Sequence, residues 1–163
     1  MIKITIGTAT LALACSLTIS ANAQLVTIKQ LSLPIAATIA TTAMETCKSQ
    51  GYNVSVHIIG NMGEVLVALR GDNTGPHTME NSMRKAYTSR TSRAPSGDMV
   101  KRLKDNPQLS QIYLTNIIAA QGALPIKIGE DVVGAAGVSG APGGDKDEAC
   151  VKAGLDNVAD QLK

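Results

Sequence analysis

Apolar residues recur every three or four positions between residues 33 and 50, which is the spacing of one face of an α-helix. Ser32 stands where a helix cap is expected, and Pro34 is tolerated in the first helical turn. Gly51 follows the last apolar position and favours the end of the helix there. The pattern therefore predicts a helix over residues 33 to 50.

Strict alternation replaces the helical spacing after residue 53. Valine or isoleucine occupies positions 54, 56 and 58, whereas Ser55 and His57 occupy the positions between them, as on the two faces of a strand. A Gly-Asn-Met-Gly turn at 60 to 63 then leads into a second strand-like run over 64 to 70. Residues 53 to 70 therefore predict a β-hairpin.

The remaining pattern predicts three more helices and three more strands. Elements in the order helix, hairpin, helices, three strands and helix are typical of one α+β domain. The prediction is a single domain with a mostly antiparallel, five-stranded sheet flanked by helices. The further helices are expected over 78 to 94, 96 to 105 and 145 to 162, and the further strands over 116 to 120, 124 to 128 and 131 to 139.

Residues 1 to 23 have the pattern of a secretory signal peptide. A weakly basic start precedes an apolar run over 4 to 19, and the sequence Ala-Asn-Ala at 21 to 23 is typical of a cleavage site. The run is too short for a stable membrane span. We therefore expect a mature domain over 24 to 163 that is periplasmic or secreted; acylation at Cys15 is the weaker alternative.

Composition narrows the possible partners of the mature chain. About 140 residues are enough for one domain with its own core. The formal net charge of the full chain is only +2, and there is no Trp or Phe and only three Tyr. Nucleic-acid surfaces need stronger positive charge or more aromatic rings, so no nucleic-acid partner is expected.

Two cysteines remain after the expected cleavage, Cys47 and Cys150. The first lies near the end of the first predicted helix and the second near the start of the last one. If these helices lie side by side and antiparallel on one face of the sheet, the two residues meet within bonding distance. The oxidising compartment of an exported protein favours a disulfide between them, and two separate buried thiols are the alternative.

Long collinear stretches of the chain resemble one known family. They are TCKSQGYNVSV from residue 46, GPHTMENSMRKAYTSRT from 75, GALPIKIGEDVVGAAGVSGAPGGDKDEAC from 122 and AGLDNV from 153. In these segments the chain is similar to the GlcG/HbpS-like family of haem-binding or haem-degrading domains. The resemblance implies an antiparallel sheet with flanking helices, a small homo-oligomer, and haem or another tetrapyrrole as ligand. The chain departs from the family pattern where Asn116 and Gln121 bring polar groups near the expected pocket.

The best candidate haem site lies where a Gly/Pro loop meets the helix that begins near residue 78. Haem needs an axial donor, an apolar slot and cations for its propionates. His77 is the candidate iron ligand, Met79 and Met83 offer soft apolar surface, and Arg84 and Lys85 could meet the carboxylates. Met79 is also a conceivable second donor. In the alternative interpretation His77 only helps to cap the helix, and the methionines belong to the core.

Other functions stay open. The same pocket could serve a small-molecule enzyme or a sensor domain that binds a small organic metabolite, with His77, Arg84 and Tyr87 as its polar groups. A third possibility is an interaction protein whose oligomer meets a membrane-protein partner. Ser139 has no evident base beside it, so a serine hydrolase is not supported. His57, on a strand, is more typical of a hydrogen-bonded sheet histidine than of a ligand.

The glycines between residues 132 and 144 match neither the P-loop nor the dinucleotide pattern. Gly134, Gly137 and Gly140 permit close approach of another group to the strand that carries them. That group is either a flat ligand against a smooth pocket wall or a closely packed helix or subunit.

We predict that the exported protein begins at Gln24. Cleavage after Ala23 follows from the apolar run and the small residues at 21 and 23. N-terminal sequencing or intact mass of the exported protein checks it. A chain that retains Met1, or one that begins at a lipidated Cys15, would contradict it.

Overall fold

The computed structural model describes residues 26–163, so the predicted signal peptide lies outside the described residues. Within them no helix combines the length and the apolar character needed to cross a membrane. The elements in chain order are α1 (Leu33–Ser49), β1 (Ser55–Ile59), β2 (Val65–Arg70), α2 (Thr78–Ser92), α3 (Gly97–Asp105), η1 (Ser110–Tyr113), β3 (Ala123–Ile128), β4 (Asp131–Ser139), α4 (Gly144–Asn157) and η2 (Ala159–Gln161).

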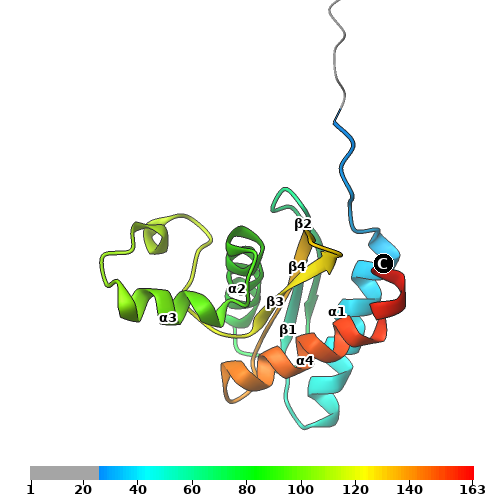
Figure 1. Cartoon of the computed structure of the whole chain (residues 1–163). Helices are drawn as coiled ribbons and strands as arrows, with labels where there is room; N and C mark the ends of the chain where they lie inside the picture. The colour runs from blue at the N-terminus through cyan, green and yellow to red at the C-terminus, as the bar shows by residue number, and fades with distance from the viewer. Residues whose placement is uncertain (1–25) are drawn as a thin grey trace, which may run out of the picture.

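The four strands form one antiparallel sheet in the order β2-β1-β4-β3. Helices α1 and α4 cover one face, and α2 lies across the other, with α3 and the segment after it extending away from α2 (Figure 1). The predicted α+β class is therefore confirmed. The β1–β2 hairpin is also confirmed, whereas the final helix ends at Asn157 rather than at 162.

The predicted fifth strand over 116 to 120 is wrong. Asn116 has a left-handed backbone with φ of 69°, which interrupts an extended strand. Side chains of α2 bind the backbone that follows: Arg84 donates to Ile117 O at 2.7 Å, and Ile118 N–H donates to Thr88 Oγ1 at 2.9 Å. The apolar residues here reflect burial against α2 instead of pairing with another strand.

The two faces of the sheet differ in chemistry. Val56 and Ile58 of β1 and Val138 of β4 belong to the apolar core under α1 and α4. On the opposite face Ser55 Oγ and Thr78 Oγ1 of α2 lie 2.8 Å apart and form a hydrogen bond. Helix α2 is thus held on the sheet largely by polar side chains.

His57 makes the second of these polar contacts. Its Nδ1 lies 2.8 Å from Ser82 Oγ, and that hydroxyl donates to Met79 O at 3.1 Å. His57 is therefore a buried, hydrogen-bonded sheet histidine, as expected. Burial lowers the pKa of its imidazole below the ordinary value of 6.5.

Backbone atoms pack closely against each of the three glycines Gly134, Gly137 and Gly140. A Cβ at Gly137 would collide with Ser82 O of α2, and one at Gly134 would collide with Ile59 O of β1. These two therefore serve packing inside the chain. A Cβ at Gly140 would meet Asn53 O, but Gly140 also borders the cleft described below.

The predicted disulfide is present between Cys47 and Cys150, whose Cα atoms are 5.6 Å apart. Helices α1 and α4 lie side by side, so the end of α1 meets the middle of α4 (Figure 1). The cysteines are separated by 103 residues in the sequence. For a loop of this length the chain-entropy model gives a stabilisation of up to about 4–5 kcal/mol.

The buried imidazole predicts a pH dependence of stability. Between the lowered native pKa of His57 and the unfolded value of 6.5, the unfolded chain binds a proton that the native chain does not. The free energy of unfolding should therefore fall as the pH drops through the window below about 6.5, and this fall should be smaller in His57→Gln. Urea unfolding between pH 5.5 and pH 7.5, approximate limits on either side of the reference pKa, checks it.

The matched control is His77→Gln, which removes an exposed imidazole at the start of α2 and should keep the wild-type slope. If the free energy of unfolding of His57→Gln depended on pH as steeply as that of the wild type, the pH dependence could not be attributed to His57.

Candidate functional site

An open cleft of about 510 Å³ lies beside the start of α2. Its walls come from the turn after α1, the loop that precedes α2, the end of β4 and the start of α4. Most of its lining residues are glycine or carry amide or hydroxyl groups. They are Gly51, Tyr52, Asn53, Asn73, Thr74, Gly75, His77, Thr78, Asn81, Lys85, Ser139, Gly140, Ala141, Gly143, Gly144 and Asp147.

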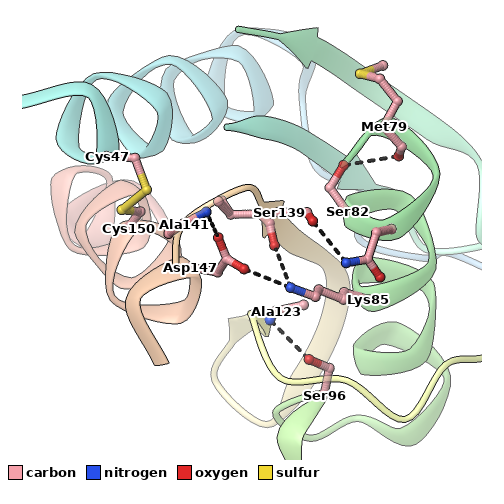
Figure 2. A network of polar contacts seen from close by, with 12 residues as sticks. Cys47, Met79, Ser82, Lys85, Ser96, Ala123, Ser139, Ala141, Asp147 and Cys150 are labelled. Carbon is pink, nitrogen blue, oxygen red and sulfur yellow. Dashed lines mark hydrogen bonds and ion pairs between the residues drawn. A yellow bond between two sulfur atoms is a disulfide. The ribbon is translucent and has the colours of Figure 1, made fainter. Parts of the chain in front are cut away.

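A buried ion pair forms the floor of this cleft (Figure 2). Lys85 Nζ lies 2.8 Å from Asp147 Oδ2 and donates to Val138 O at 3.2 Å. The N–H of Ala141 donates to Asp147 Oδ1 at 3.0 Å. Only 5% and 3% of the Lys85 and Asp147 side chains are exposed, so the pair joins α2, β4 and α4 in a site with little water.

Gly122 fits closely against this pair. Its φ of 129° is one that favours glycine, and a Cβ there would lie 2.8 Å from both Lys85 Nζ and Asp147 Cβ. Burial raises the pKa of the Asp147 carboxyl, while Lys85 and the Ala141 N–H oppose that shift. The floor is a compact paired site, and neither charge is left without a partner.

The start of α2 adds another polar contact to the cleft. Asn81 Nδ2 donates to Ser139 Oγ at 2.9 Å, which links α2 to the end of β4. Sequence reasoning missed Asn81 and Asp147 and considered Ser139 only as a nucleophile. In the sequence Asp147 is one of several acidic residues at the start of a helix, and only the three-dimensional contact with Lys85 distinguishes it.

His77 is the most accessible of the predicted site residues. It is exposed at the residue before α2 and makes no side-chain capping bond. Its imidazole borders the main cleft and also a side cavity of about 290 Å³ that Glu80, Arg84 and Ile118 help to line. No hydrogen bond joins this imidazole to another group among residues 26–163. His77 is therefore presented toward open space.

The other predicted site residues are in different surroundings. Arg84 is half-buried in the side cavity, 3.3 Å from Glu80 Oε1, and it donates to Ile117 O. Met79 and Met83 are half-buried and line neither cavity. The side chain of Met79 is directed away from the ion pair (Figure 2). The structure thus brings His77 and Arg84 together and places Lys85 beneath the cleft.

Within the described part of the chain, no group of three or more His, Cys, Asp or Glu side chains could hold a metal ion. His77 could still donate to an iron that is carried by a macrocycle, because haem requires only an axial ligand from the protein.

The ion pair predicts an asymmetric response to mutation. Asp147→Ala leaves the Lys85 ammonium buried without its partner, so the free energy of unfolding should fall by about 3–5 kcal/mol. Replacing both residues, with Lys85→Met and Asp147→Leu, should recover most of that loss. Urea unfolding at neutral pH measures each variant.

The control is Lys152→Met, which removes an exposed ion pair with Asp156 on the same helix as Asp147. That change should cost less than about 1 kcal/mol. A loss in Asp147→Ala no larger than in this control would show that the buried pair is not a structural constraint.

Comparisons with known proteins agree with this fold. A crystal structure of HbpS is 33% identical with a TM-score of 0.79, and the match covers 83% of this chain and 94% of that one. A double mutant of Streptomyces reticuli HbpS is 31% identical with a TM-score of 0.80, over 89% and 98% of the two chains. The crystal structure of a PduOC:Heme complex shares the fold, at 16% identity and a TM-score of 0.71 over 78% and 94% of the chains.

A comparison with curated protein sequences gave no match. A family model described as "Haem degrading protein HbpS-like" matches residues 31–156. This match spans most of the chain and confirms the resemblance found in its sequence. The chain belongs to the HbpS-like family.

Proposed function

We propose that this protein is an exported haem-binding protein in which His77 would hold the haem iron. Membership of the HbpS-like family supports haem as the ligand class. The related PduOC fold has been crystallised as a haem complex. The signal-peptide pattern of residues 1 to 23 supports export to the periplasm or the exterior.

The accessibility of His77 is the observation that carries this proposal. An imidazole without a hydrogen-bond partner among the described residues keeps a ring nitrogen available for iron. It lies where the main cleft and the side cavity meet, so a flat ligand can approach it from either. Bound haem would supply an iron centre capable of redox and ligand-exchange chemistry.

The surroundings of His77 fit haem as a shallow, reversible site. Tyr52 and Ala141 in the main cleft and Ile118 in the side cavity provide apolar contact, and the other lining groups are largely polar. A macrocycle held here keeps part of its surface in solvent. Binding would therefore depend strongly on the bond between His77 and iron, because apolar burial contributes less than in an enclosed pocket.

Arg84 is the better of the two predicted propionate partners. It is half-buried beside His77, and its 3.3 Å contact with Glu80 is an exposed pair that can exchange for another carboxylate. Lys85 is paired with Asp147 beneath the cleft, so binding a propionate through Lys85 would break a buried ion pair.

A second candidate function is binding of a small organic metabolite in the main cleft, in an enzyme or a sensor domain. The observation that favours it is the polar lining, in which Asn53, Asn73 and Thr74 face the cleft with Asn81 and Ser139. Such groups orient a small polar ligand by hydrogen bonds. Turnover or binding of metabolites without added haem would distinguish this function from the first.

We also propose that the protein forms homo-oligomers. Tyr113 at the end of η1 and the next residue, Leu114, are 81% and 57% exposed, and Val100 on α3 is 44% exposed. Apolar side chains exposed together on one protruding segment favour contact with another chain. Contact with a membrane-protein partner remains a less specific use of the same surface.

The haem proposal predicts saturable binding that depends on the imidazole. Titration of the mature protein with haem should give a Soret band, and His77→Gly should weaken binding at least about tenfold because the iron loses its protein ligand. Free imidazole added to His77→Gly should restore the spectrum. This rescue separates a bond to iron from a structural role of the loop.

The control is Gln108→Ala, an exposed position in the segment after α3, which should bind haem as the wild type does. Wild-type protein without saturable binding would refute the function. Equal affinity and spectra in His77→Gly would refute only the assignment of the ligand.

A further inference from the structure

A different site surrounds Arg90, near the opposite end of α2 from His77. Two cavities, of about 300 Å³ and about 310 Å³, are both lined by Arg90 and Asn61. Arg93 borders the first, and Tyr87 and Met62 border the second. The haem proposal uses none of these residues.

The guanidinium of Arg90 has unused hydrogen-bonding capacity. One terminal nitrogen, Nη2, donates to Asn61 Oδ1, which fixes the side chain between the two cavities. Its Nε is buried and has no acceptor among residues 26–163. Residues 1 to 25 contain no Asp or Glu that could supply a carboxylate. A buried donor without an acceptor is unfavourable, so a shift of the Arg90 side chain that brings Nε to a ligand oxygen would be favoured.

Arg93 adds a second cation to the same cavity. It is exposed, with a left-handed backbone at the end of α2, and neither arginine forms an ion pair within the described residues. Burial and the nearby Arg93 lower the pKa of Arg90, while Glu64 opposes that shift. Two arginines held near one another without paired carboxylates form a site suited to an anion.

None of the carboxylates near Arg90 forms an ion pair with it within the described residues. Asp131 is paired with Lys29 at 3.2 Å, and Glu64 accepts a hydrogen bond from Met62 N–H at 2.7 Å in the hairpin turn. Glu130 borders the first cavity and is exposed to solvent. The carboxylates therefore tune the local charge without occupying the Nε side of Arg90.

We propose that Arg90, Arg93 and Asn61 form a second ligand site, which binds a carboxylate group. The planar guanidinium of Arg90 can bind both oxygens of a carboxylate, Arg93 adds charge, and Nδ2 of the Asn61 amide adds a donor. Tyr87 and Met62 offer apolar contact to the rest of the ligand. The carboxylate belongs to a free small dicarboxylate or to a propionate of a tetrapyrrole.

Succinate is the probe, titrated calorimetrically into the mature protein at low ionic strength. Wild type should bind it saturably, and Arg90→Met should weaken binding at least about tenfold, because hydrogen bonds to charged groups are lost. Arg90→Lys should also bind more weakly, since an ammonium keeps the charge but lacks the planar fork. The control is Arg102→Met, an exposed α3 arginine bonded to Gln111, which should bind as wild type does.

Competition with metal-free protoporphyrin IX and its dimethyl ester identifies the source of the carboxylate. Displacement of succinate by the free acid but not by the ester supports a tetrapyrrole propionate. Failure of both to displace bound succinate supports a free dicarboxylate. Neither compound contains iron, so the result does not depend on a bond between iron and His77.

The absence of saturable succinate binding in the wild type would overturn the second site, as would unchanged affinity in the arginine variants. Circular dichroism shows whether Arg90→Met folds. If it does not, Arg93→Met decides, because Arg93 is exposed and its removal leaves the interior intact. Haem binding through His77 would be unaffected by any of these failures.

Discussion

The ion pair between Lys85 and Asp147 constrains the arrangement of the candidate site. Two charges leave water to form it, so its net contribution to stability is small even though breaking it is costly. Its value lies in position: it fixes α2 against β4 and the start of α4, and the absence of a side chain at Gly122 leaves room for it. The cleft beside His77 exists because these three elements meet in this way.

Helix α2 and the candidate sites lie on the face of the sheet opposite the main apolar core. The apolar face of the sheet, under α1 and α4, holds the large core that opposes unfolding. The other face is polar, and a small set of hydrogen bonds orients α2 on it, from Ser55 at one end to the ion pair further along. Because α2 crosses that face, its first residues reach the cleft beside His77 and its last residues reach the cavities at Arg90.

The elements predicted from sequence are those that local patterns determine. Alternation over 53 to 70 and the glycine at 51 were enough for the hairpin and the end of α1. The strand prediction for 116 to 120 failed because the apolar residues there are buried by contacts with α2, and the α2 residues that make these contacts are distant in the sequence. For the same reason Lys85 was predicted to meet a haem carboxylate, because its partner Asp147 lies on another helix. The exposed position of His77 could be predicted because a Gly/Pro loop before a helix is itself a local signal.

The disulfide connects the chemistry of the compartment to the shape of the cleft. Cys47 lies a few residues before the turn that carries Tyr52, and Cys150 lies one helical turn after Lys146, so the bridge joins two walls of the cleft. The ammonium of Lys146 lies 5.3 Å from the centroid of the Tyr52 ring, a second and weaker link between those walls. In a reducing compartment the covalent link would be lost, and only the apolar packing of α1 against α4 and this weaker contact would hold the two walls together at the cleft. An oxidising location therefore favours not only the stability of the fold but also a fixed width of the cleft in which His77 is presented.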